Sequence, residues 1–120
     1  MIDDLMFAAL RTIAPNDDGT SRVFPDIAPH GTPRPYITYQ SVGGRPTATL
    51  DGPDELRNSR MQINVWADVR STADGTMEQV VTALSAGELN ATPLGDPVSA
   101  YEEETKLRGS RLDFSIWYRP

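Results

Sequence analysis

Cysteine is absent from the 120-residue sequence. Its absence excludes disulfide bonds, thiolate nucleophiles and the thiolate ligands of structural zinc sites. The chain therefore depends on a hydrophobic core, and a hydrophobic content of 38% is enough for one core of ordinary domain size. We expect a single domain over residues 1–120.

Positive charge is also scarce, because eleven lysines and arginines stand against seventeen acids, for a net charge of −6. Gripping DNA or RNA through phosphates needs clustered lysine and arginine, so specific nucleic-acid binding is not expected. No apolar run approaches the roughly 18 residues of a membrane span. The opening stretch MIDDLMFAAL starts with acids rather than a basic segment, which argues against a secretory signal. No membrane partner is predicted.

Residue patterns that carry catalysis are missing. His30 is the only histidine, and it lies in a proline-rich stretch without a nucleophile-elbow motif, so a solvated loop histidine is the simpler interpretation. The glycine pair at 43–44 lacks the lysine and the helix that follow in a phosphate loop. Neither the NDDG stretch at 16–19 nor the acidic run at 102–104 has the spacing of a calcium loop. The sequence predicts no enzyme, no cofactor and no metal site.

Hydrophobic periodicity predicts an α+β order of elements. Apolar residues recur at helical spacing over 2–13 and again from Ala73 to Leu84. Ser71 resembles the start of a capping box for the second helix, and Gly87 is a natural C-terminal cap. Strands are expected at 22–24, 36–42, 58–69, 98–104 and 107–118, with a loop over 88–97. The economical arrangement is an antiparallel or mixed sheet with two helices packed on one face.

Two of these strands share a design in which one face is apolar and the other is polar with a tryptophan. In residues 58–69 the apolar positions alternate with polar ones, and residues 107–118 repeat the pattern. Tryptophan and arginine are enriched at binding hot spots, so the second face is predicted to contact another chain. The alternative is that each tryptophan only covers the rim of the core. The candidate interface residues are Arg60, Gln62, Asn64, Trp66, Arg111, Asp113 and Trp117.

Residues 43–58 form the longest stretch without a periodic pattern. The segment GGRPTATLDGPDELRN contains two prolines and three glycines, which favour turns over a continuous strand or helix. A loop of this length is usually functional or mobile. We expect a long exposed loop or a hairpin arm.

Three stretches together resemble a known family. They are PYITYQSV at 35–42, RMQINVWA at 60–67 and YEEETKLRGSRLDFSIWY at 101–118. With the proline-rich approach to the first strong strand and TLDG in the loop, they resemble the tail-completion family of long-tailed bacteriophages and prophages. The resemblance covers nearly the whole chain, and its ending is the most specific part.

The resemblance implies a structural virion protein without catalytic residues. Proteins of this kind are tail terminators, which cap the tail tube as a ring, commonly of six subunits, and join it to the head connector. The implied partners are other copies of the chain, the tail tube protein and the head–tail connector protein, while DNA passes through without specific binding. The implied location is the head-proximal end of the virion tail, after assembly in the host cytoplasm.

A ring around DNA gives the acidic segments a possible use, since carboxylates that face the lumen repel phosphate. The candidate lumen or rim residues are Asp51, Asp54, Glu55, Glu102, Glu103 and Glu104. Plain solubility explains them equally well. The alternative function is a small binding module, a helix-covered sheet that dimerises through its tryptophan face to form a ligand pocket.

Overall fold

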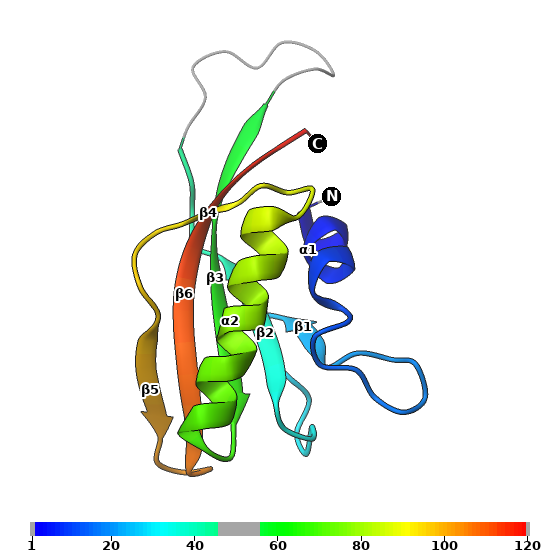
Figure 1. The fold of residues 1–120 in the computed structure, drawn as a ribbon, viewed down its shortest axis with the longest axis vertical. Coiled ribbons are helices and arrows are strands. Elements are labelled where there is room, and N and C mark those ends of the chain that lie inside the picture. Colours follow the sequence, from blue (N-terminus) through cyan, green and yellow to red (C-terminus); the bar gives the residue numbers. More distant parts are fainter. Residues whose placement is uncertain (1, 46–55, 120) are drawn as a thin grey trace.

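The computed structural model describes residues 2–45 and 56–119 and contains two helices and six strands (Figure 1). Within these residues the order is helix, three strands, helix, three strands. The elements are α1 (Ile2–Leu10), β1 (Val23–Pro25), β2 (Tyr36–Ser41), β3 (Arg57–Ala67), α2 (Arg70–Ala86), β4 (Thr92–Pro93), β5 (Val98–Glu102) and β6 (Leu107–Tyr118). The expected α+β class is confirmed.

The strands form one mixed sheet in the order β1, β2, β3, β6, and both β4 and β5 pair with the outer edge of β6. β1 runs parallel to β2, and every other pair is antiparallel. The longest ladder joins β3 to β6, from Arg57 opposite Tyr118 to Ala67 opposite Arg108. This ladder is the centre of the sheet, and it brings the two strands of matching sequence pattern side by side.

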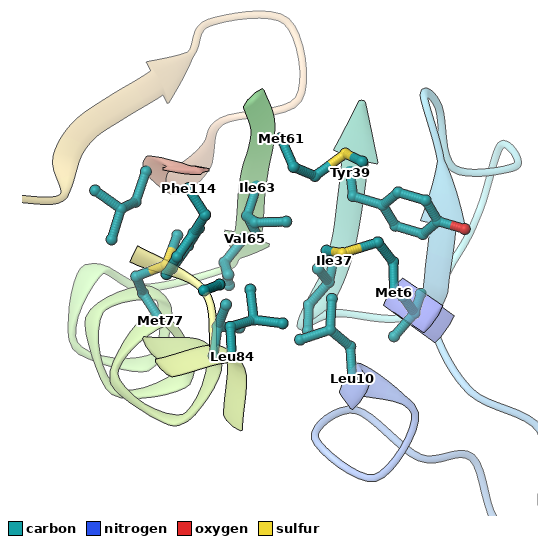
Figure 2. Packing of buried hydrophobic residues seen from close by; sticks show 14 of the residues in the cluster. Met6, Leu10, Ile37, Tyr39, Met61, Ile63, Val65, Met77, Leu84 and Phe114 are labelled. Atoms are coloured by element: carbon teal, nitrogen blue, oxygen red, sulfur yellow. The ribbon is translucent and has the colours of Figure 1, made fainter. Parts of the chain in front are cut away.

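Both helices cover the same side of the sheet, where the apolar positions of the strands point. α2 lies along β3 and β6, and α1 lies beside α2 and β1 (Figure 1). Ile37 and Val65 from the strands and Leu10 and Leu84 from the helices point into one interior (Figure 2). Met61, Ile63, Val65, Ala67, Phe114 and Ile116 are all at most 1% exposed. The predicted core faces of both long strands are confirmed.

The predicted start of α2 is wrong. The capping residue is Val69, which offers no side-chain hydrogen bond, and Ser71 lies inside the first turn. Gly87 does follow the helix, but its φ of −84° is not left-handed. A Cβ there would lie 2.4 Å from the Ala83 carbonyl oxygen, so glycine is needed for space rather than for a special φ.

The loop expected over 88–97 is interrupted by β4. Thr92 and Pro93 pair with Ser115 and Phe114 on the outer edge of β6. A two-residue strand that contains proline has no periodic pattern, and its conformation is fixed by the edge on which it lies. The other strand predictions differ from the structure by two residues or fewer at each end.

Candidate assembly interface

In the described part of the chain, the side of the sheet opposite the helices carries no helix. We call this side, over β3 and β6, the open face. Gln62 is in register with Asp113, and Asn64 with Arg111, between the buried pairs of the core side. By the alternation of side chains, the open face therefore contains all seven predicted positions, which are Arg60, Gln62, Asn64, Trp66, Arg111, Asp113 and Trp117, together with Ser115.

The polar side chains of the open face bind one another across the ladder and, in one case, along β3. The Arg60 guanidinium donates from Nε to Oδ2 of Asp113 at 2.8 Å. Nε of Arg111 donates to Oδ1 of Asn64 at 2.8 Å, and Nδ2 of Asn64 donates to Oε1 of Gln62 at 3.3 Å. Cross-strand pairs of this kind fix side-chain positions on a sheet. The open face is therefore an ordered polar surface rather than a row of loose charges.

These pairs differ in their contact with solvent. The Asp113 side chain is 16% exposed and its partner Arg60 is 51% exposed, while Asn64 is only 8% exposed. A carboxylate that is mostly covered and already ion-paired presents little free charge. The open face offers hydrogen-bonding groups and guanidinium edges to a partner, with its acid neutralised internally.

Trp66 lies across the neighbouring strand. It is in register with Gly109 of β6, and a Cβ on Gly109 would lie 2.8 Å from the Trp66 ring. The ring therefore occupies the space that any other side chain at 109 would fill. Trp66 is half-buried, with part of its surface in solvent. Because residue 109 is glycine, the Trp66 ring can lie flat against the open face of β6.

A hollow of about 410 Å³ opens beside this tryptophan. Its floor includes Tyr36, Thr38, Trp66 and Leu107, and its walls are the loop from Asp26 to Arg34 and the turn that contains Glu102 and Thr105. We call it the Trp66 hollow. Tyr36 is in register with Trp66, so β2 and β3 contribute adjacent aromatic rings. Burial raises the pKa of the Tyr36 hydroxyl, and the Glu102 carboxylate raises it further.

Trp117 does not join Trp66 in one patch. It is in register with Asn58, and Trp66 is in register with Gly109, eight positions earlier on β6. At about 3.3 Å per residue the two tryptophans stand about 26 Å apart along the strand. Trp117 is 44% exposed and lines a separate hollow of about 660 Å³ with Leu5, Ala8, Ala9, Ala83 and Leu89. The structure thus divides the predicted interface between the two ends of the ladder.

Of the two acidic candidate segments, the structure describes only the one at 102–104. Glu102, the last residue of β5, and Glu103 and Glu104 in the turn to β6 are all exposed, beside the end of β3. Asp51, Asp54 and Glu55 lie outside the described residues. The chain on either side of them, at Arg45 and Leu56, lies where β3 begins, so about 33 Å of strand separates that end from the β5–β6 turn.

Sequence reasoning missed the Trp66 hollow. The loop 26–34 was interpreted only as a proline-rich link, although it places Asp26, His30 and Arg34 around the hollow. Tyr36 and Thr38 share the strand alternation of 36–42, and their face could have been assigned together with that of Trp66. The return of the loop over this face leaves no periodic signal in the sequence.

Among the described residues there is no group of three or more histidines or acids that could hold a metal ion. None of the described helices is long and apolar enough to cross a membrane.

Comparison with known proteins identifies the family. The model of the family described as Tail completion protein gp17 matches residues 5–119. No curated protein matches the chain.

Proposed function

The chain belongs to the Tail completion protein gp17 family, whose members are structural proteins of the phage tail, and we propose that it is a tail terminator. In this role it caps the tail tube as a ring at the head-proximal end and joins the tube to the head connector. The family carries a structural role and contacts with other tail or head proteins. The observation that supports a contact function most directly is the ordered open face, which no described helix covers.

The dimensions of the subunit suit a six-membered ring. The molecule measures 47 × 31 × 25 Å. We place six bodies 31 Å wide and 25 Å thick in a ring with their long axes along the channel. The circle through their centres is then twice the subunit width in diameter, and subtracting one subunit thickness leaves a hole of about 37 Å. Four such bodies leave only about 19 Å by the same geometry. Duplex DNA, roughly 20 Å across, passes the first hole and not the second.

Ring contacts are heterologous, so each subunit uses two different patches. The two tryptophans mark two candidate contact surfaces at opposite ends of the β3–β6 ladder. We assign the end of the open face with Trp66 to contact with the adjoining virion protein. We assign the exposed apolar surface around Trp117 to one side of the ring contact, where it meets a different patch of the neighbouring subunit.

The acidic segments fit the two rims of such a ring. With the long axis along the channel, Glu103 and Glu104 stand at one rim. We expect Asp51, Asp54 and Glu55, which lie outside the described residues, at the other. Carboxylates at a rim repel the DNA backbone, so DNA moves through without being held. The net charge of −6 supports this arrangement.

The loop 43–58 is the second assembly element of the proposal, with residues 46–55 outside the described structure. We expect it to reach a neighbouring subunit or the end of the tube. Deletion of residues 46–56 should leave a folded protein, judged by its unfolding curve, that no longer caps tubes. A deleted protein that still caps tubes would show that the loop has no part in assembly.

Electron microscopy of tails made without this protein tests the function itself. Overlong or headless tails are expected, because nothing then stops tube growth or presents a surface to the connector. Tails of normal length with heads attached would overturn the proposal. Light scattering of the isolated protein separates it from a ligand-binding dimer, since a terminator gives rings or monomers that join only tail tubes.

A further inference from the structure

The Trp66 hollow combines two aromatic rings with an excess of negative charge. Asp26 and Glu102 line it, and Arg34 also lies at its wall. Nε of Arg34 is 2.9 Å from Oδ1 of Asp68, so that cation is already paired with an acid outside the hollow. Counted together with Asp68, Arg34 adds no net charge, so the net charge around the hollow is that of the two carboxylates.

Glu102 is held in position for a contact. The Thr105 hydroxyl donates to Oε1 of Glu102 at 2.6 Å. This bond occupies one carboxylate oxygen and leaves Oε2 to accept from a ligand. Glu102 is in register with Leu107 of the floor, and it lies on β5 two residues beyond Ala100, which continues the row of Trp66 and Gly109. The carboxylate thus stands at the edge of the aromatic floor.

An aromatic floor with a carboxylate at its edge matches the chemistry of a guanidinium group. Arginine stacks its planar cation on tryptophan and tyrosine rings while its N–H groups bind a carboxylate. A lysine ammonium is more strongly hydrated and has no planar face to stack. A volume of about 410 Å³ is at the lower end of ligand sites, which suits one side chain rather than a cofactor.

We propose that the Trp66 hollow receives an arginine side chain of the adjoining tail or head protein. This inference rests on the proposed terminator function, since it names the chemistry by which the open face holds its partner. Each copy of the chain carries a net charge of −6. Long-range electrostatics therefore favours a cationic partner over a second copy.

The experiment uses hexa-arginine as the probe and follows the indole N–H signal of Trp66 by NMR, in a Trp117→Phe background that leaves one indole. We expect the signal to shift on addition of hexa-arginine at low salt. Hexa-lysine should bind at least about threefold more weakly, because it cannot stack. Equal binding of the two peptides would overturn the assignment to arginine.

Two glutamates of the same turn provide a matched pair of variants. Glu102→Gln removes the carboxylate that lines the hollow, and Glu104→Gln removes the same charge from a residue that does not line it. Glu102→Gln should weaken hexa-arginine binding about fivefold, and Glu104→Gln by less than about twofold. Equal weakening would show attraction to general surface charge and overturn the site.

Assembly assays separate this inference from the function on which it rests. If Glu102→Gln loses peptide binding and still supports normal tails, the Trp66 hollow does not bind the partner in the virion, and this inference fails. The proposed terminator function then stands. If tails that lack the whole protein are normal, the terminator function itself fails. Self-association that shifts the Trp66 signal without peptide, and that Glu102→Gln abolishes, would place a second copy in the hollow and overturn the choice of partner.

Discussion

The two sides of the central sheet are built by different rules from the same strands. On the covered side, Ile63 and Phe114 are fully buried against the helices. On the open face, Arg60, Asp113 and Asn64 are held by bonds between the strands. The covered side is stabilised by apolar burial, and the open side keeps polar groups ordered while still reachable. On our proposal, the covered side makes the sheet stable before it meets a partner, and the ordered polar groups of the open face then select that partner.

The largest expected difference between the two sides is in stability. Phe114→Ala should lower the free energy of unfolding by about 3–5 kcal/mol, because it opens a cavity in the core. Gln62→Ala, one pair away on the open face, should lower it by about 1 kcal/mol or less. Urea unfolding measures both. Similar losses would show that the open face is part of the stabilising core.

The next effect concerns the support of Trp66. Gly109→Ala places a methyl group against the ring, so the ring must move off the sheet, at a cost of about 1 kcal/mol or more in unfolding free energy. The fluorescence of Trp66, read in a Trp117→Phe background, should shift to longer wavelength as the ring enters water. Gly75→Ala, on α2 with nothing within 4 Å, should instead raise stability by about 0.5–1 kcal/mol. Unchanged fluorescence in Gly109→Ala would contradict the flat placement.

A smaller effect is expected from the ion pair of the open face. A double-mutant cycle with Arg60→Gln and Asp113→Asn should give a coupling of about 0.2–1 kcal/mol, because Arg60 is half exposed and solvent screens the pair. The coupling should shrink as salt is added. A coupling several times larger, insensitive to salt, would mean that the pair is buried more deeply than the structure shows.

The smallest effect is an alkaline loss of stability shared by the two sides. Burial raises the pKa of Tyr36 on the open side and of Tyr39 on the covered side above the ordinary value of 10.0. Above pH 10 the unfolded state therefore loses these protons first, and stability falls as the pH rises. Tyr36→Phe and Tyr39→Phe should each reduce the fall in urea midpoint between pH 8 and pH 11. An unchanged fall in both variants would exclude the tyrosines as its cause.

The covered side of the sheet was predictable from sequence, and the open side was predictable only in part. Alternation in 58–69 and 107–118 assigns each residue to a face because side chains alternate along any strand. It does not give the register between strands, so it could not show that Trp66 and Trp117 stand at opposite ends of the ladder. The Trp66 hollow depends on a proline-rich loop that folds back over β2, a tertiary contact without a local pattern. The predicted N-terminal cap of α2 was wrong, because the helix begins at Val69, whose backbone is extended and whose side chain makes no capping hydrogen bond.

The central claim is that the open face becomes covered when the protein enters the tail. Because the chain has no cysteine, a single Gln62→Cys or Thr82→Cys variant carries one thiol, on the open face or on the exposed side of α2. The measurement is the rate of thiol labelling in the free protein and in purified tails. The account predicts that Gln62→Cys loses at least about tenfold in labelling rate on assembly while Thr82→Cys changes little. Equal labelling of Gln62→Cys in both states, with protection of Thr82→Cys instead, would contradict it.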